Sequence, residues 1–201
     1  MIRSLAIAIL AALSLSGCAL LASPDPVQLY RFGDTDGVSI APVTAPTQVK
    51  LRAVEFPQAA QGDRLLGITG SEVAFIGGAR WVSPAAQLYA ASLENAFAGQ
   101  ARAVRLIGRR ELTPTTRVLD IDVRAFETRY ASVDATPDVV VTARARLLRF
   151  PERTVVAEET FAVSRAAGEN RVLAIVAAYD EATREVNARI VAWTDANAVG
   201  E

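Results

Sequence analysis

The C-terminal part of the chain carries one long amphipathic pattern, which restricts the possible folds more than any other feature of the sequence. Between residues 170 and 196, side chains suited to a core recur at steps of three and four: Val172, Ile175, Val176, Tyr179, Thr183, Val186, Ile190 and Trp193. This spacing is typical of a helix with one apolar stripe. A stripe of this length can lie across a whole sheet and needs a comparable surface to cover it. We therefore expect one long helix packed against a sheet.

The segments that precede this helix alternate apolar and polar residues, as half-buried strands do. Strands are predicted at residues 27–33, 49–56, 64–69, 73–81, 103–107, 118–126, 139–150 and 154–163. The clearest is 118–126, in which one face is expected to be apolar and the other to carry Asp120, Asp122, Arg124 and Phe126. A second, shorter helix is predicted at 84–98, and Gly77-Gly78 is interpreted as a bulge or a strand end.

The order of these segments is strands, helix, strands and long helix. Short turns join the long strands, so most of the sheet should be antiparallel. Two helices packed on one face of such a sheet make a two-layer α+β domain. We expect a single domain over residues 27–196, followed by a short tail at residues 197–201.

The N-terminus has the features of a bacterial targeting segment. Arg3 supplies a positive charge, and residues 5–15 form an uncharged apolar run. This run is about 11 residues long, which is too short to span a bilayer core that needs about 20. Leu15-Ser16-Gly17-Cys18 then matches the lipobox of bacterial lipoproteins. We expect residues 1–17 to be the signal peptide and Cys18 to be the acylated N-terminus, with an unmodified cysteine in an ordinary secretory signal as the alternative.

Residues 18–26 are expected to form a lipidated tether between the membrane and the domain. Residues 19–26 span at most about 28 Å when fully extended, so the domain would remain near the membrane, on its periplasmic face. The residue after the cysteine is Ala19. An aspartate at that position tends to retain lipoproteins in the inner membrane, and the outer membrane is therefore favoured.

The composition excludes several classes of protein. The chain has no histidine and a single cysteine, so sites that depend on histidine are excluded, and acylation of Cys18 would remove the only thiol. We predict that the protein is not an enzyme and holds no metal or cofactor. The 21 Lys and Arg residues nearly balance the 22 Asp and Glu residues, which gives no strong field to attract nucleic acid.

Asp120 and Asp122, with Glu127 nearby, are the remaining candidates for acid–base chemistry. The simpler interpretation is that they are exposed strand residues that form ion pairs with arginines on a neighbouring strand, namely Arg144, Arg146 and Arg149. The alternative, that these arginines bind anionic lipid head groups, is left open.

The aromatic residues are most simply placed in the core or at its edge. They include Phe75, Trp81, Tyr89, Phe97 and Trp193. Because Tyr and Trp are favoured in protein interfaces, an interface role is the alternative. Phe75 and Trp81 are the two residues for which we keep that alternative.

Taken together, these segments resemble a known family. The lipobox is followed by a strand "YRFG" at residues 30–33, and a hairpin then ends in "ARWVSPAAQLYAASLENAF". A strand "VLDIDVRAFE", a hairpin of "VVVTARARLLRF" and "TVVAEETFAV", and a closing helix "VLAIVAAYDEATREVNARIVAW" complete the order. This order and spacing resembles the ABC-type transport auxiliary lipoprotein family, to which the PqiC-type lipoproteins belong.

The resemblance implies a fold similar to the N-terminal domain of TolB, lipidation at Cys18 and no catalytic residues. It also implies that the chain accompanies an ABC transporter whose substrate-binding subunit carries an MCE domain. Such systems move lipids or other hydrophobic molecules across the Gram-negative envelope. The expected partners are therefore the MCE subunit and its permease and ATPase, and self-association is left open.

Within that setting, we expect the chain to be a membrane-anchored docking adaptor. The expected docking surface is an exposed strand edge or the apolar hairpin around Phe75. Two alternatives remain. The first is a lipid carrier, which needs a cavity between the sheet and the long helix, and the second is a TolB-like envelope assembly factor.

Overall fold

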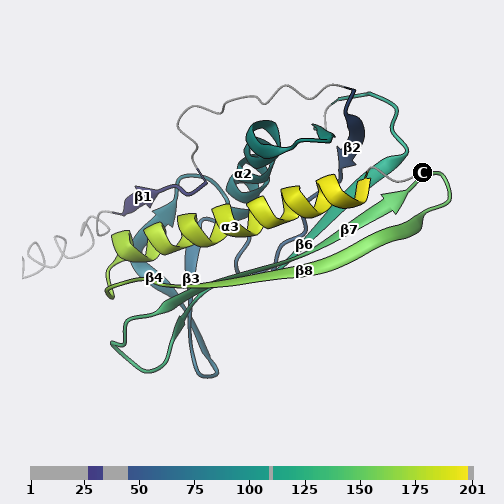
Figure 1. The fold of residues 1–201 in the computed structure, drawn as a ribbon. Coiled ribbons are helices and arrows are strands. Elements are labelled where there is room, and N and C mark those ends of the chain that lie inside the picture. Colours follow the sequence, from purple (N-terminus) through teal and green to yellow (C-terminus); the bar gives the residue numbers. More distant parts are fainter. Residues whose placement is uncertain (1–26, 34–44, 109–110, 199–201) are drawn as a thin grey trace, which may run out of the picture.

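The computed structural model describes residues 27–33, 45–108 and 111–198. The predicted signal peptide (1–17), Cys18, the tether (18–26) and the end of the predicted tail lie outside these residues. The elements are β1 (Gln28–Tyr30), β2 (Thr47–Leu51), β3 (Arg64–Thr69), β4 (Glu72–Trp81), α2 (Ala85–Gln100), β5 (Val104–Ile107), β6 (Arg117–Tyr130), β7 (Asp138–Arg149), β8 (Thr154–Ala166) and α3 (Val172–Ala198). Both helices lie on one face of the sheet (Figure 1), which confirms the predicted two-layer α+β fold. In the described part, no helix is both long and apolar enough to cross a membrane.

Strand β6 organises the sheet because it pairs with three other strands. On one side it forms a long antiparallel ladder with β7, which in turn pairs with β8. On the other side, its beginning pairs in parallel with β2 and its end in parallel with β3. The sheet continues from β2 to β5, and from β3 through β4 to β1. The antiparallel pairings join the long strands, as predicted, whereas the short parallel pairings result from crossovers that the sequence pattern does not reveal.

The helix α3 covers β7 and β8, as its apolar stripe predicts. Ile175, Tyr179, Val186 and Ile190 of this stripe are completely or almost completely buried. Facing them is a row of side chains on β7 without exposed surface: Val139, Val141, Ala143, Ala145 and Leu147. Near the end of the helix, the Trp193 ring meets that of Phe161 on β8, with 6.1 Å between the ring centroids. The long helix and the β6–β7–β8 ladder therefore form the main hydrophobic core.

The position of Phe126 corrects the predicted faces of β6. The alternation places Phe126 on the polar face, but a register shift between Val123 and Ala125 adds one residue and moves Phe126 to the core face. Its ring lies 4.7 Å from that of Tyr179 and 5.0 Å from that of Phe32. A bulge of this kind changes which face a side chain occupies without changing the pattern that is read from the sequence.

Three further boundaries differ from or refine the prediction. The strand predicted at 49–56 ends at Leu51, and only an isolated bridge between Glu55 and Asp122 continues it. The first strand is shortened to Gln28–Tyr30. The Gly77-Gly78 prediction is confirmed, because the β3–β4 register shifts between the pairs Leu66–Phe75 and Arg64–Arg80, and Gly78 has a φ of 69°.

The N-terminal segment is fixed in the core at Phe32 and Gly33. Phe32 is buried, and its ring packs edge-on against that of Trp81, 4.9 Å away. Gly33 has a φ of 69°, and a Cβ at this position would overlap the Cβ and Oγ of Ser92 on α2. Its N–H donates to the Asp180 carboxylate on α3 at 2.8 Å. Phe32 and Gly33 therefore connect the N-terminal segment to β4 and to both helices.

Candidate docking surfaces

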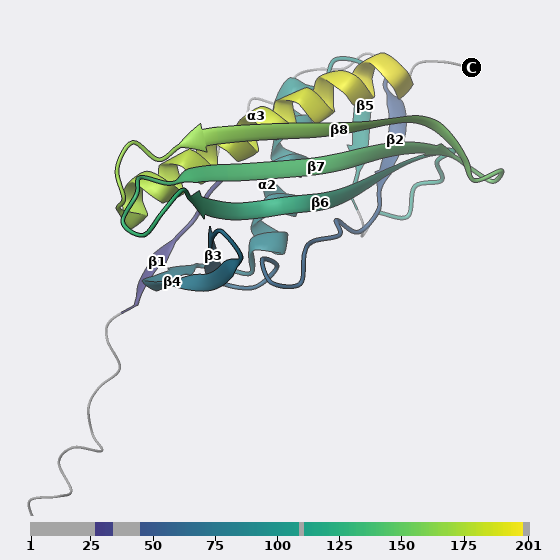
Figure 2. The same cartoon turned by 90° about the horizontal axis from the view of Figure 1, so that it is seen from below.

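The β3–β4 hairpin extends from the sheet away from the face that carries the helices (Figures 1 and 2). Thr69 pairs with Glu72, so the turn consists of Gly70 and Ser71. Gly70 has a φ of 59°, which suits the first central position of a two-residue hairpin turn. The tight turn fixes the register and therefore determines which side chains of the hairpin share a face.

Apolar side chains on one face of this hairpin form what we call the hairpin patch: Ile68, Val73 and Phe75. Val73 pairs with Ile68, and it is 59% exposed, whereas Phe75 is 40% exposed. The Arg64 guanidinium carbon lies 3.8 Å from the centroid of the Phe75 ring, a geometry that holds the ring by a cation–π contact. The patch is thus both exposed and ordered, and such patches commonly mark contact sites.

On the opposite face of the hairpin, which carries Gly67 and Ala74, the hairpin and the end of β6 form a small hollow of about 240 Å³. Its lining includes Gly67, Phe75 and Tyr130. A Cβ at Gly67 would lie 3.4 Å from the Tyr130 ring, so the absence of a side chain at Gly67 lets that ring approach closely. Burial raises the pKa of the Tyr130 hydroxyl above its ordinary value, and the phenol remains a hydrogen-bond donor. The hollow is below the usual size range of small-molecule sites but suits an inserted side chain.

Trp81 does not belong to this surface. It is buried in an aromatic cluster, where its ring contacts those of Phe32, Phe126 and Tyr179 at centroid distances of 4.9, 6.3 and 5.3 Å. At 2% exposure, it has no surface to offer a partner. Of the two aromatic residues kept as interface candidates, only Phe75 reaches the surface.

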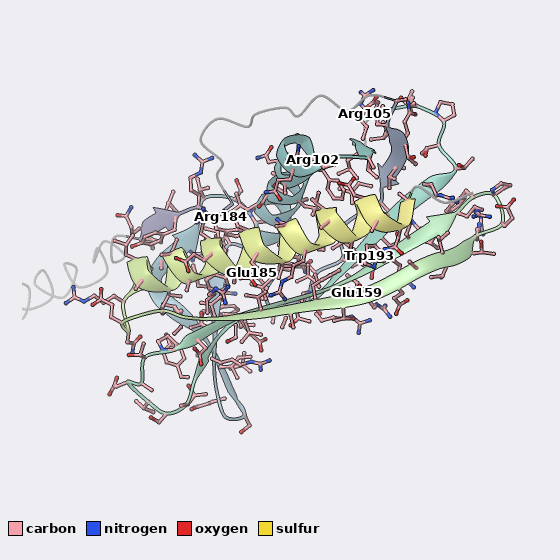
Figure 3. All side chains as sticks on the ribbon, in the orientation of Figure 1. Arg102, Arg105, Glu159, Arg184, Glu185 and Trp193 are labelled. Carbon is pink, nitrogen blue, oxygen red and sulfur yellow. The ribbon has the colours of Figure 1, made fainter. Side chains whose placement is uncertain are left out.

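The free edge of β8 is the second candidate surface. Within the described residues, β8 pairs only with β7, so its other edge is open. Arg189 of α3 reaches over this edge and donates to the Ala162 carbonyl at 3.4 Å. Arg189 and Arg165 also form ion pairs with Glu185, which lies along the same side of α3 (Figure 3). Charged side chains that cover an edge in this way disfavour strand addition, so the edge is a poorer docking site than the hairpin patch.

The carboxylates of β6 form ion pairs with arginines, as the simpler interpretation predicts, but Asp120 is buried and not exposed as expected. Asp120 lies 3.4 Å from Arg146 and 3.0 Å from Arg52. Asp122 lies 3.2 Å from Arg144, whose guanidinium is also 3.6 Å from Glu158 on β8. The geometry assigns these residues to the stabilisation of the uncovered sheet face.

The space that a lipid carrier would use is filled by the protein itself. The stripe of α3 is buried from Ile175 to Ile190, and the facing row of β7 has no exposed surface. Two larger hollows, of about 840 and 910 Å³, open at the surface instead. The first lies beside the β7–β8 turn and includes Pro151 in its lining, and the second lies between β2 and α2 and includes Glu94. Neither lies in the layer between the middle of α3 and the sheet.

Polar contacts that no sequence pattern predicts connect distant segments of the chain. The Asp195 carboxylate on α3 accepts from the N–H groups of Arg102, Ala103 and Val104 at 2.7, 3.0 and 3.0 Å. Asn187 donates to Ser92 at 3.0 Å inside the α2–α3 interface. Each contact joins residues about 90 positions apart, and no local pattern marks them. Polar residues within an otherwise apolar helical stripe are the only sequence signal that could have suggested the second.

Two solved structures show what this fold is similar to. The crystal structure of protein XCC0632 from Xanthomonas campestris, described as a DUF330 protein, is 26% identical and has a TM-score of 0.70. The match covers 85% of this chain and 96% of that one. A second structure, titled as an uncharacterized protein, is 14% identical with a TM-score of 0.65, over 84% of this chain and 99% of the other.

The sequence comparisons agree with the structural ones. No curated protein matches the chain. The family model described as the ABC-type transport auxiliary lipoprotein component matches residues 30–191. This range includes α2, most of α3, the hairpin patch and nearly all of the sheet. The chain therefore belongs to the family of ABC-type transport auxiliary lipoprotein components.

Proposed function

We propose that this chain is a lipid-anchored docking adaptor of an MCE-associated ABC transport system. It faces the periplasm, its Cys18 is acylated, and it is held at the outer membrane. The family description supports an auxiliary role in transport rather than catalysis. The sequence at residues 15–19 supports acylation and outer-membrane placement.

The observation that carries the docking role is the hairpin patch. An exposed aromatic residue that is held in place by Arg64, on a hairpin fixed by a two-residue turn, costs little entropy to bind. A tether that confines the domain to the membrane surface raises its effective concentration near a partner there. A weak contact through this small patch can therefore still form a populated complex.

Co-purification with the MCE subunit of the same organism tests this role. Val73→Asp and Phe75→Asp place a charge in the contact without disturbing the core, and each should abolish co-purification after gentle extraction. Val155→Asp is the matched control, because Val155 is 52% exposed and lies on β8 at the far end of the sheet. All three variants should show unchanged thermal unfolding. If both hairpin variants still co-purify with the MCE subunit, the patch is not the docking surface.

The anchor is tested separately by mass analysis of the native protein. We expect a mature chain that begins at Cys18 and carries acyl groups, and a Cys18→Ser variant that is released from the membrane fraction. An intact leader or an unmodified thiol would refute the anchoring. Native mass spectrometry of the wild-type protein should show no bound lipid apart from the acyl groups, because the layer under α3 is filled.

A further inference from the structure

Three segments that are far apart in the sequence end together at one end of the molecule. They are β1, the connection between β6 and β7 (residues 131–137), and the first turn of α3. Figures 1 and 2, which differ by a rotation of 90°, both show them at the same end, opposite to the β7–β8 turn. We call this the anchor end, because β1 is also the described element nearest to Cys18 in the chain.

Each of these segments exposes an aliphatic side chain. Leu29 of β1 is 54% exposed, Val133 of the β6–β7 connection is 78% exposed, and Leu173 of α3 is 72% exposed. Val27, which precedes β1, is exposed as well. The three aliphatic side chains therefore lie at one end of the molecule, beside the part of the chain that leads to Cys18. Single exposed aliphatic residues are common on protein surfaces, so it is the tether that gives these three a specific partner.

The tether identifies that partner. Eight residues, 19–26, separate Cys18 from the first described residue, Val27. A flexible segment of this length has a root-mean-square span of only about 16 Å. If Cys18 is inserted in a leaflet, the tether keeps the anchor end within about 28 Å of that leaflet even when fully extended, and closer on average. The far end of α3 is about 40 Å away, because the helix has 27 residues with a rise of about 1.5 Å each.

We propose that the anchor end rests on the lipid leaflet, with Leu29, Val133 and Leu173 inserted at the level of the head groups. The proposal rests on the acylation of Cys18 in the proposed function. It gives the domain a defined orientation, in which α3 points away from the membrane and the hairpin patch stays free for a protein partner. The acyl chains on Cys18 and these three weak contacts would then bind the domain to the membrane together.

The charges at this end indicate what kind of lipid is needed. Arg171 forms an ion pair with Glu169 at 3.4 Å, and Arg129 forms one with Glu127 at 2.7 Å. Asp134 lies next to Val133. Because the arginines are already paired, contact with the leaflet depends on aliphatic insertion rather than on attraction to anionic lipids. Zwitterionic vesicles should therefore be sufficient, and the contact should depend little on salt.

Site-specific fluorescence on the acylated protein tests the contact. The natural chain has Cys18 as its only cysteine, and acylation blocks it, so a label attaches only to an introduced thiol. Leu29→Cys, Val133→Cys and Leu173→Cys are labelled with the environment-sensitive dye NBD and reconstituted into phosphatidylcholine–phosphatidylethanolamine vesicles. Val155→Cys is the matched control, because its exposure of 52% is close to that of Leu29.

We expect the three anchor-end labels to shift to shorter wavelength and to brighten about twofold or more as they leave water. Lipids that carry a spin label near the head group should quench them. The Val155→Cys label should respond to neither. Labels that stay in water at all three positions, or an equal response at Val155→Cys, would overturn the proposal. So would labels that respond only after the MCE subunit is added, because that result assigns this end to a protein partner.

A second arrangement separates this contact from the proposed anchoring. Cys18→Ser protein with an N-terminal His tag is attached to vesicles that contain nickel-chelating lipid, and carries the same labels. If native Cys18 proves to be unacylated, the anchoring in the proposed function fails, while the response of the labels here still decides whether the anchor end contacts a leaflet.

Discussion

The close contact of Gly33 with Ser92 and Asp180 predicts that a side chain at position 33 destabilises the domain. We expect Gly33→Ala to destabilise the domain by about 2–5 kcal/mol. An alanine at a φ of 69° costs about 1–2 kcal/mol because of its left-handed backbone. Its Cβ would also overlap Ser92, and overpacking of this kind adds about 1–3 kcal/mol. A shift that relieves the overlap would stretch the 2.8 Å hydrogen bond from Gly33 to Asp180.

The assay is urea unfolding followed by tryptophan fluorescence. Trp81 reports directly, because its ring packs against Phe32, the residue before Gly33. Gly62→Ala is the matched control: a Cβ there would meet no atom within 4 Å, and the backbone conformation is ordinary for an L residue. We expect the control to change the free energy of unfolding by about 0.5 kcal/mol or less.

A double variant isolates the steric part of the effect. Ser92→Gly removes both atoms that the new Cβ would overlap. We expect Gly33→Ala and Ser92→Gly together to be less destabilising than the sum of the two single changes, by about 1–2 kcal/mol. If Gly33→Ala matches the Gly62→Ala control, or if the two changes simply add, the close approach of these segments does not contribute to stability and the reasoning is wrong.

Three further predictions concern the contacts that hold the layers together. Asp195→Ala should lower the free energy of unfolding by about 2–3 kcal/mol, because three N–H groups lose a charged acceptor; a loss in urea unfolding no greater than that of Arg184→Ala, which breaks an exposed pair, would contradict this. Phe126→Ala should cost about 3–5 kcal/mol, since it empties the aromatic core, while Phe75→Ala should cost less than about 1 kcal/mol. Burial raises the pKa of the Tyr179 hydroxyl above its ordinary value, so the phenol stays neutral in the folded chain. The contribution of this neutral phenol to the free energy of unfolding is complete below pH about 10 and is lost as the pH rises above that value. The stability of Tyr179→Phe should therefore fall less steeply with pH above 10 than that of the wild type, as measured by a pH titration followed by circular dichroism.

Most of the secondary structure follows from local patterns in the sequence. The stripe from Val172 to Trp193 and the alternation in β7 identify their elements because each buries one face over many residues. The faces of β6 beyond residue 123 could not be predicted, since a single bulge reverses them and leaves no signature in the alternation. The parallel pairings of β2 and β3 with the two ends of β6 depend on its length of 14 residues and on crossovers, neither of which is a local property.

The candidate surface was predictable only in part. From the sequence, Phe75 and Trp81 were equal candidates for an interface, because both are aromatic residues on the same predicted strand. Their burial differs because the irregularity around Gly78 separates the two parts of β4. Trp81 remains on the core side beneath Phe32, whereas Phe75 lies on the projecting part of the hairpin. Three-dimensional context, rather than residue type, decides which aromatic side chain a partner can reach.

The way in which β1 is held has a mechanical consequence if the domain is attached through Cys18, as proposed. Residues 28–30 pair with β4, the Tyr30 carbonyl accepts from the Val82 N–H at 2.7 Å, and Gly33 is bonded to α3. A force applied to the N-terminus is therefore transmitted to both the sheet and α3, and does not simply separate β1 from β4. A load applied there would be distributed over the contacts to β4 and α3 instead of acting on β1 alone.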